Sequence, residues 1–245
     1  MDKEYEAKYH SKEESNWWFI SRRAAICKLL KNTERSARIL DVGCAGGPLL
    51  LDLKKEKFTN VYGLDFSPEA IDLCKQRGLE RVFVMDGHYP DFENDFFDVI
   101  ISSDSLEHLE KDEVALANWK RILKPGGTLY VFVPAYQFLW SDHDLINHHY
   151  RRYSKRLLAE RVSGAGFKIE QKGFWNFAMF FPTSAFRLIQ RLFSSNKKDH
   201  KPKDQLESFS PFINRLLITW MKFENTVFNS IGIPVGVSAF IKAKK

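Results

Sequence analysis

Apolar runs of strand length alternate with amphipathic segments along the chain from Ala37 onward. Such runs are typical of buried strands, and the spacing of apolar residues between them is helical. Strands that alternate with helices form a mainly parallel sheet with helices on both faces. The pattern therefore predicts an α/β fold. Strands are expected at 37–41, 60–65, 81–86, 97–102, 128–134, 167–173 and 233–245.

Residues typical of helix starts and ends lie between these predicted strands. Pro48 suits a first helical position, and Ser67 followed by proline and glutamate is typical of a capped helix start. A proline and two glycines at 124–127 predict a turn into the fifth strand. Helices are expected at 48–57, from 67 onward, at 111–123, from the polar cluster at 135–154 to about 163, and at 212–230.

Residues 1–36 precede the alternating pattern and begin as a charged amphipathic helix. They carry Trp17 and Trp18 ahead of Arg22, so aromatic faces and a guanidinium lie in one segment. The segment is expected to form a helical lid over a ligand. In the alternative reading it docks its aromatic side chains on the core.

Residues 174–234 interrupt the core at 37–173, whose final strand is expected at 235–245. The insert begins with an unusually aromatic amphipathic stretch, and its polar, lysine-rich part at 194–209 is expected to be a solvated loop or linker. Such an insert can form a substrate cap, a dimer surface or a surface for peripheral membrane contact.

A glycine-rich loop follows the first strand in the sequence DVGCAGG at 41–47. Its glycines adopt backbone angles closed to other residues and let a ligand approach the main chain. Asp41 ends the strand where ligands of parallel sheets bind, and Asp65 at the tip of the second strand is placed to accept ribose hydroxyl protons. The loop therefore predicts a nucleotide-like cofactor.

The next two strands also end in polar residues. Asp86 and Gly87 follow the third strand, and Ser103 and Asp104 end the fourth. A single polar turn residue is unremarkable, but the repetition at one edge of the sheet favours a ligand cleft there.

The densest polar cluster, at 135–154, follows the fifth strand. Its histidines are candidate general bases, and Arg151 and Arg152 offer planar forks that hold a carboxylate or phosphate by two bonds. In the alternative reading the arginines cap a surface helix and the histidines bond loop carbonyls.

Composition narrows the class of protein. A chain of 245 residues with 44% apolar residues buries a full core, and its net charge of +6 favours anionic partners. Aromatic RNA-binding motifs are absent, so nucleic acid is not an expected partner. Three cysteines without framework or zinc spacing predict buried free thiols in a reducing compartment, and no metal site is expected. The polar N-terminus and the absence of a run of about 18 apolar residues predict a cytoplasmic protein.

Together, DVGCAGG at 41–47, Asp65, Asp86, SLEHL at 105–109 and LKPGG at 123–127 resemble a class I S-adenosylmethionine-dependent methyltransferase. The resemblance implies a Rossmann-like seven-stranded sheet of order 3-2-1-4-5-7-6, with only the last strand antiparallel and the helical insert between strands 6 and 7. It implies S-adenosyl-L-methionine as the cofactor and S-adenosyl-L-homocysteine as its product.

The resemblance also implies roles for individual residues. Asp41 and the loop glycines would meet the methionine part of the cofactor, Asp65 the ribose, Asp86 the adenine, and Phe66 would pack on the adenine. The family usually has glycine where this chain has Ala45, so a slightly altered loop path is expected; the same alanine disfavours an NAD site. The expected cofactor-binding residues are Trp18, Arg22, Asp41, Gly43, Cys44, Ala45, Gly47, Asp65, Phe66, Asp86, Gly87, Ser103 and Leu106.

A narrower likeness extends into the second half. WWF near the start, LWSDHD, HHYRRYS and IPVGVS resemble a bacterial methyltransferase subgroup of mostly unassigned substrates, some linked to peptide or polysaccharide tailoring. The Asn-Pro-Pro-Tyr signature of amine methylation is absent after the fourth strand, so oxygen is the expected acceptor atom.

The predicted reaction is O-methylation of a carboxylate on an anionic peptide or small metabolite. One alternative is a hydroxyl of a quinone, lipid-like or polysaccharide-related acceptor, and a non-enzymatic alternative is a cofactor-binding module that docks on a membrane or partner. The candidate catalytic residues are His143, His148 and His108. The candidate substrate-binding residues are Tyr136, His149, Arg151, Arg152 and Tyr153.

Overall fold

The computed structural model describes residues 12–193, 210–231 and 233–245. The predicted start of the N-terminal helix before residue 12 and the predicted polar segment at 194–209 lie outside these residues. All three cysteines are free; Cys44 and Cys74 are buried and Cys27 is half-buried. In the described part of the chain, no helix has both the length and the apolar character needed to cross a bilayer.

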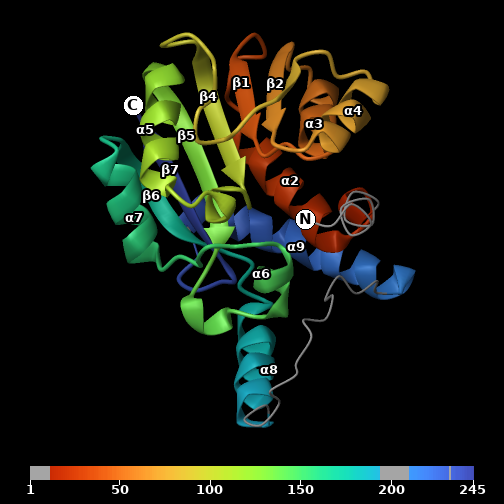
Figure 1. Ribbon diagram of the computed structural model, residues 1–245. Coiled ribbons are helices and arrows are strands. Elements are labelled where there is room, and N and C mark those ends of the chain that lie inside the picture. The colour runs from red at the N-terminus through yellow and green to blue at the C-terminus, as the bar shows by residue number, and fades with distance from the viewer. Residues whose placement is uncertain (1–11, 194–209, 232) are drawn as a thin grey trace.

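Seven strands form one sheet with the order β3-β2-β1-β4-β5-β7-β6 (Figure 1). Strand β7 is antiparallel to both of its neighbours, and the other pairs are parallel. The predicted Rossmann-like α/β architecture and strand order are confirmed. The strands are β1 Arg38–Val42, β2 Asn60–Asp65, β3 Val82–Val84, β4 Phe97–Ser103, β5 Leu123–Pro134, β6 Lys168–Trp175 and β7 Ser238–Lys244.

Helices cover both faces of the sheet, because neighbouring residues of the buried strands point to opposite faces. Ile39 of β1 belongs to a core with α2, α3 and α4, whereas Leu40 belongs to a second core with α5 and α7. The helices are α2 Trp17–Leu29, α3 Pro48–Lys55, α4 Pro68–Gln76, α5 Asp112–Ile122, α6 Asp142–Ile146, α7 Lys155–Gly164, α8 Phe180–Phe193 and α9 Pro211–Ile231. Short 3-10 turns, η1 Leu106–His108 and η2 Gln137–Leu139, follow β4 and β5.

The helix starts confirm the sequence signals at two places. The Ser67 side chain accepts a hydrogen bond from the Ala70 backbone N–H and caps α4. Pro48 occupies the start of α3 behind Gly47, whose φ of 78° lies in the left-handed region.

Two predictions about β5 and the segment that follows it are wrong in detail. Strand β5 already begins at Leu123, which pairs with Phe97. The residues of the predicted turn therefore lie within the strand, where the register shifts before the pair Val99–Thr128. The polar cluster does not open one long helix. It forms α6, whose continuation is broken at His148 with a φ of 55°, and α7 begins separately behind its cap.

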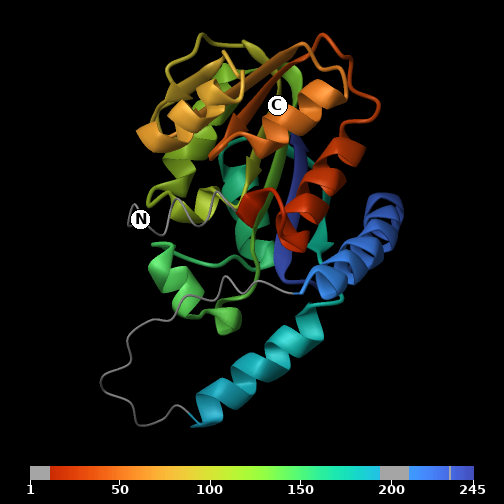
Figure 2. The same ribbon diagram turned by 90° about the vertical axis from the view of Figure 1, so that its right-hand side faces the viewer.

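The helical insert between β6 and β7 consists of α8 and α9. Helix α9 packs along α2, where the Asn214 side chain accepts from the Trp17 N–H at 2.8 Å and donates to the Ser15 carbonyl at 2.8 Å (Figure 2). Helix α8 extends away from the sheet in both ribbon views. Large apolar side chains are exposed on the two helices: Phe181, Phe186, Leu188, Ile189, Phe212, Leu216, Trp220 and Phe223.

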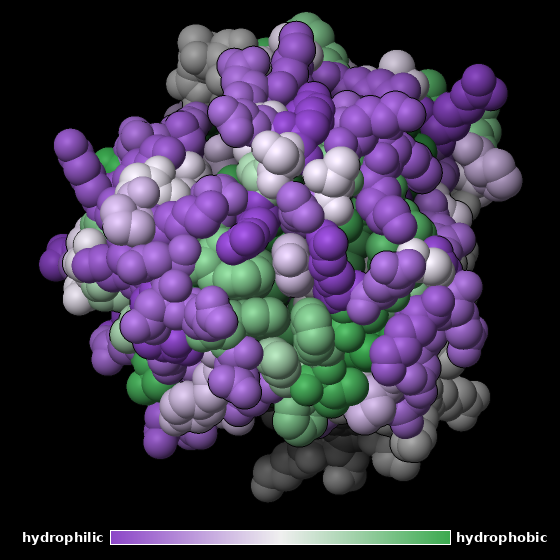
Figure 3. All heavy atoms as spheres, turned by 90° about the horizontal axis from the view of Figure 1, so that it is seen from above, coloured by the Kyte–Doolittle hydropathy of each residue, from purple (hydrophilic) through white to green (hydrophobic). Residues whose placement is uncertain are grey.

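In Figure 1 the carboxyl ends of β4 and β5 point down. Figure 3 looks from above and therefore shows the opposite end of the molecule. Hydrophilic residues cover most of that face, with an apolar area near its centre (Figure 3). The chemistry predicted for the strand tips therefore belongs to the other end of the sheet.

Candidate active site

Strands β1, β2 and β4 end at one cavity of about 720 Å³, which is the size of an ordinary small-molecule site. Its walls come from the loops after these strands, from the loop after β3, from α2 and from Asn147, His148 and Tyr150. Ten predicted cofactor residues line it: Arg22, Asp41, Gly43, Cys44, Ala45, Asp65, Phe66, Asp86, Gly87 and Ser103. Trp18, Gly47 and Leu106 are not among the lining residues.

The glycine loop is closely packed. Gly43 has a φ of 76°, and a Cβ atom there would lie 2.5 Å from the Cβ of Ser105. A Cβ on Gly47 would lie 2.4 Å from Leu79 Cδ1. Ala45 occupies the left-handed region with a φ of 46°, a conformation that costs an alanine about 1 kcal/mol. The loop therefore keeps a glycine-like path despite the alanine.

Asp65 holds this loop in place. Its Oδ2 accepts from the Ala45 N–H at 2.9 Å, and its Oδ1 accepts from the Ser67 N–H at 2.9 Å. One carboxylate thus joins the glycine loop to the start of α4. Asp65 also lines the cavity, so the same carboxylate is placed to accept from a ligand hydroxyl.

The cavity is acidic in a protein of net charge +6. Its lining includes six carboxyl-bearing residues, Glu13, Asp41, Asp65, Glu69, Asp86 and Asp104. The two lining arginines are neutralised: Arg22 pairs with Asp104 at 3.0 Å and Arg23 with Asp52 at 2.7 Å. A cationic ligand therefore gains more in this cavity than an anionic one.

Asp41 is the buried member of this group. Burial, with Asp65 and Glu13 close by, raises the pKa of its carboxyl group from 3.8 to about 8. The free protein consequently holds this side chain mostly protonated at neutral pH. A bound ammonium or sulfonium group would favour its ionised form.

An Asp41→Asn variant tests this assignment through stability. Because the folded pKa is raised, the stabilising effect of the protonated carboxyl is complete below about pH 4 and is lost as the pH rises toward 8. We expect the free energy of unfolding of the variant minus that of the wild type, from urea titrations without cofactor, to be at least about 1 kcal/mol larger at pH 8 than at pH 5. An equal difference at the two pH values would contradict the raised pKa.

The N-terminal helix α2 forms one wall of the cavity. Phe19 and Arg22 line it, and the Arg22 guanidinium also donates to Ser238 Oγ at 2.6 Å and lies 4.2 Å from the centroid of the Trp175 ring. Trp18 packs edge-on against Trp175 and belongs to the core boundary. The arginine of this segment thus faces the cavity, and its tryptophans pack on the core.

The opposite end of the cofactor loop has the features expected beside an adenine. Phe66 is 80% exposed at the cavity, and the Asp86 carboxylate accepts from the His88 N–H at 2.8 Å and contacts His88 Nδ1 at 2.7 Å. The Gly87 carbonyl accepts from the Trp119 indole at 2.8 Å, which fixes the loop after β3. An exposed aromatic ring beside a fixed polar loop suits a flat heterocycle.

Two of the three candidate bases line the cavity. His108 and His148 are among the lining residues with Asn147 and Tyr150, whereas His143 is not and lies 3.2 Å from Asn147 Nδ2 through its Nδ1. Burial and the neighbouring His149 lower the pKa of His108 to about 3 and that of His143 to about 4. His148 is the exposed imidazole of the group.

Arg151 and Arg152, which were expected to hold an acceptor carboxylate, bind groups of the protein instead. Arg152 forms a two-bond fork with the buried Asp144, with Nε–Oδ1 at 2.7 Å and Nη2–Oδ2 at 2.9 Å. Burial alone would raise the pKa of Asp144, but its bonds with His149 and Arg152 lower it. Arg151 donates to the Leu109 carbonyl at 2.8 Å and lies 3.2 Å from Asp112. Both guanidinium groups thus anchor the loop, and neither lines the cavity.

The remaining candidate substrate residues are also held by the protein. Tyr153 is fully buried and donates to Asp112 at 2.8 Å, and Tyr136 stacks on Phe174 with ring centroids 5.0 Å apart. His149 contacts Asp144 through Nδ1 at 2.9 Å. None of the three is a lining residue. A polar, aromatic sequence cluster can therefore be part of the loop's internal structure.

Several functional candidates were missed by the sequence reasoning. Glu13, His88, Asn147 and Tyr150 line the cavity, and Glu107 is fully buried beside it. Glu107 belongs to the SLEHL motif at 105–109. His88 follows the predicted Asp86 and Gly87, and Asn147 and Tyr150 lie in the polar cluster at 135–154, whereas the approach of Glu13 to the cavity depends on the tertiary fold.

Comparisons with known proteins agree with this geometry. Residues 40–131 match the family described as a methyltransferase domain. A ubiquinone biosynthesis O-methyltransferase of Xylella fastidiosa is 34% identical over 101 residues, which are 39% of this chain and 41% of that protein. The chain thus spans about two fifths of the length of the curated relatives it matches.

Solved structures with the same fold cover more of the chain. A SAM-dependent methyltransferase from Archaeoglobus fulgidus aligns with a TM-score of 0.58 and 18% identity over 97% of this chain and 99% of that one. A Haemonchus contortus phosphoethanolamine N-methyltransferase 2 in complex with S-adenosyl-L-methionine gives a TM-score of 0.60 and 20% identity over 91% and 52%. Residues 40–131 therefore match a methyltransferase-domain family, within a chain that has the fold of class I S-adenosylmethionine-dependent methyltransferases and for which S-adenosylmethionine is the supported cofactor.

Proposed function

We propose that the protein transfers the methyl group of S-adenosylmethionine to a hydroxyl oxygen. The observation that carries the cofactor assignment is the acidic cavity at the strand tips, in a protein of the opposite net charge. S-adenosylmethionine brings a sulfonium and an ammonium, and both are cations. Glu13 lies beside the glycine loop with Asp41, whose carboxyl group a bound cation would favour in its ionised form, and Asp65 supplies a carboxylate for the ribose.

The reaction is an in-line displacement at the methyl carbon. The acceptor oxygen forms a bond to that carbon as the carbon–sulfur bond breaks, and the electron pair of the broken bond stays on sulfur. The acceptor proton leaves to a base. The protein's main contribution is to align the two reactants, which supplies several kcal/mol of the rate enhancement in such reactions.

A hydroxyl acceptor is proposed in place of the predicted carboxylate because of the arginine pair. Arg151 and Arg152 are engaged with Asp112, Asp144 and loop carbonyls, so the cationic fork that motivated a carboxylate faces the protein. The acceptor end of the cavity offers His148, Asn147 and Tyr150 instead. His148 is the proposed base, since its imidazole is exposed at the cavity and its ring nitrogen can accept a proton.

The names of the curated relatives also support an oxygen acceptor. The curated proteins that match 39% of this chain are named as O-methyltransferases of ubiquinone biosynthesis. The apolar side chains exposed on α8 and α9 suit a hydrophobic acceptor delivered from a membrane surface, and the predicted peripheral membrane contact stays a prediction.

A methyl-transfer assay with isotope-labelled cofactor tests the proposal. Matched acceptors that differ only in a phenolic hydroxyl or a carboxylate are offered, and we expect label on the hydroxyl compound. The His148→Ala variant is expected to lower kcat by about 100-fold while the affinity for S-adenosylhomocysteine stays within about twofold. Label on the carboxylate compound alone would overturn the hydroxyl assignment, and unchanged kcat in the variant would overturn the role of His148 as the base.

A further inference from the structure

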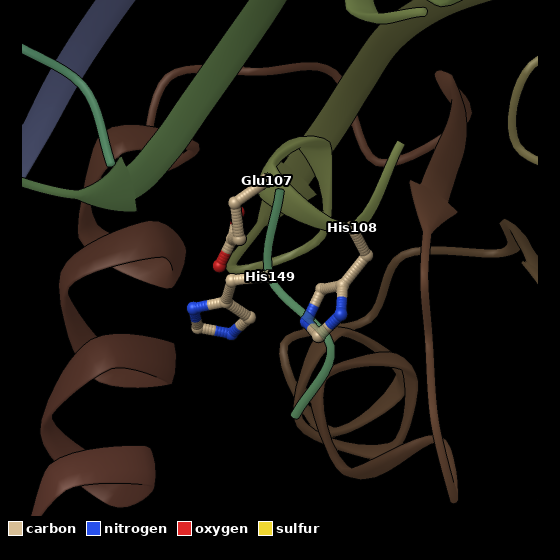
Figure 4. A group of neighbouring side chains, drawn as sticks. All are labelled: Glu107, His108 and His149. Atoms are coloured by element: carbon tan, nitrogen blue, oxygen red, sulfur yellow. The ribbon is translucent and has the colours of Figure 1, made fainter. Parts of the chain in front are cut away.

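Three side chains with metal-ligating atoms converge at the acceptor end of the cavity. Glu107 and His108 belong to η1 after β4, and His149 comes from the loop after α6. Their ligand atoms all lie within 4.8 Å of one another. Figure 4 shows the Glu107 carboxylate pointing toward the His149 ring, with His108 beside them.

Glu107 has an unusual environment. Its side chain is fully buried, and neither carboxylate oxygen has a hydrogen-bond partner among the described residues. Buried carboxyl groups are almost always hydrogen-bonded or paired, because an unpartnered one carries the full cost of desolvation. The group is therefore directed at a position where a cation would supply the missing partner.

His149 is oriented as histidines at metal sites are. Its Nδ1 lies 2.9 Å from Asp144 Oδ1, and Arg152 holds that carboxylate in turn by its two-bond fork. This contact leaves Nε2 as the available nitrogen. A carboxylate behind an imidazole fixes the ring and strengthens it as a ligand.

The rings of His108 and His149 lie close enough to the Glu107 carboxylate for all three side chains to bind one ion. The rings of His108 and His149 are perpendicular, with centroids 4.6 Å apart. Ligands about 2.1 Å from a tetrahedral zinc ion lie about 3.4 Å from one another, so small side-chain rotations bring this set to binding distance.

We propose that Glu107, His108 and His149 bind one divalent transition-metal ion, of the class of Zn²⁺ or Co²⁺. Two imidazoles and one carboxylate form a three-ligand set that leaves a position open for water or substrate. Because His108 lines the cavity, the open position faces the acceptor end. Resting on the proposed function, this places the ion where it would hold the acceptor oxygen. The sequence spacing did not predict a metal site, since the third ligand comes from a different loop.

Cobalt titration of the full chain tests the proposal without cofactor or acceptor. The protein is stripped with a chelator, and Co²⁺ is added while the visible absorption of the bound ion is recorded. We expect saturation at one Co²⁺ per chain, with displacement by Zn²⁺. Glu107→Gln and His149→Ala should each weaken Co²⁺ binding by at least about tenfold.

His148→Ala is the matched control, because it removes an exposed imidazole next to the cluster and should leave Co²⁺ affinity within about twofold. Metal-free melting temperatures show whether each variant is folded. A second measurement needs no variant: saturating Zn²⁺ should raise the melting temperature of the wild type. Absence of saturable one-to-one binding, or wild-type binding by Glu107→Gln, would overturn the site, whatever the methyl-transfer assay gives.

Discussion

Replacing Asp65 by alanine is expected to weaken the binding of S-adenosylhomocysteine by about 100-fold or more. The substitution removes the carboxylate that accepts from the Ala45 and Ser67 N–H groups, so the glycine loop loses its tie to α4. It also removes the group placed for the ribose hydroxyls. The two losses act on the same ligand, and each 1.4 kcal/mol of lost binding free energy is a factor of ten. Isothermal titration calorimetry measures the effect.

Asp72→Ala is the matched control for this variant. Asp72 lies on α4 with its side chain 68% exposed and contacts Lys75 at 3.7 Å, away from the cavity lining. Its removal should leave the affinity within about twofold. Equal affinities of Asp65→Ala and the wild type would contradict the role given to Asp65.

Replacing Arg152 by alanine is expected to lower the free energy of unfolding by about 3 kcal/mol. The guanidinium forms a two-bond fork with Asp144, a carboxylate whose side chain is fully buried. Without the arginine, that carboxylate stays in a low-dielectric site with one charged neighbour fewer. Urea unfolding monitored by far-ultraviolet circular dichroism measures the change.

Arg156→Ala separates the buried fork from ordinary surface pairing. Arg156 is 89% exposed and pairs with Glu160 along α7, so its loss should leave the free energy of unfolding close to that of the wild type. If Arg152→Ala were as stable as Arg156→Ala and bound an anionic acceptor more weakly, the carboxylate clamp predicted from the sequence would be right and the structural role wrong.

The sheet and the cofactor side of the cavity follow from local chemistry, which is why the sequence predicts them. A β-type run that ends in aspartate and glycines has few conformations available, and the parallel α/β pattern brings several such ends to one edge. A side chain at position 43 would collide with Ser105, so Gly43 is required there. Asp65 lies beside the glycine loop, as its spacing from that loop predicts. The role of Asp65 as a tie within the loop was added by the structure.

The acceptor side depends on contacts between residues far apart in the chain. The polar side chains of HHYRRY could hold either a substrate or their own loop. They hold the loop, because their partners are the carboxylates of Asp112 and Asp144. Neither carboxylate has a sequence signal that marks it as their partner. Glu107 illustrates the converse, since only the fold shows that its carboxyl is buried against histidines.

Calorimetric titration of the wild-type chain with S-adenosylmethionine and, separately, with NAD⁺ tests the central claim most directly. We predict one S-adenosylmethionine site per chain, with an affinity that rises from pH 6 to pH 8 as Asp41 becomes easier to ionise. NAD⁺ should give no saturable heat, because its two phosphates meet an acidic cavity. Saturable NAD⁺ binding without S-adenosylmethionine binding would contradict the account.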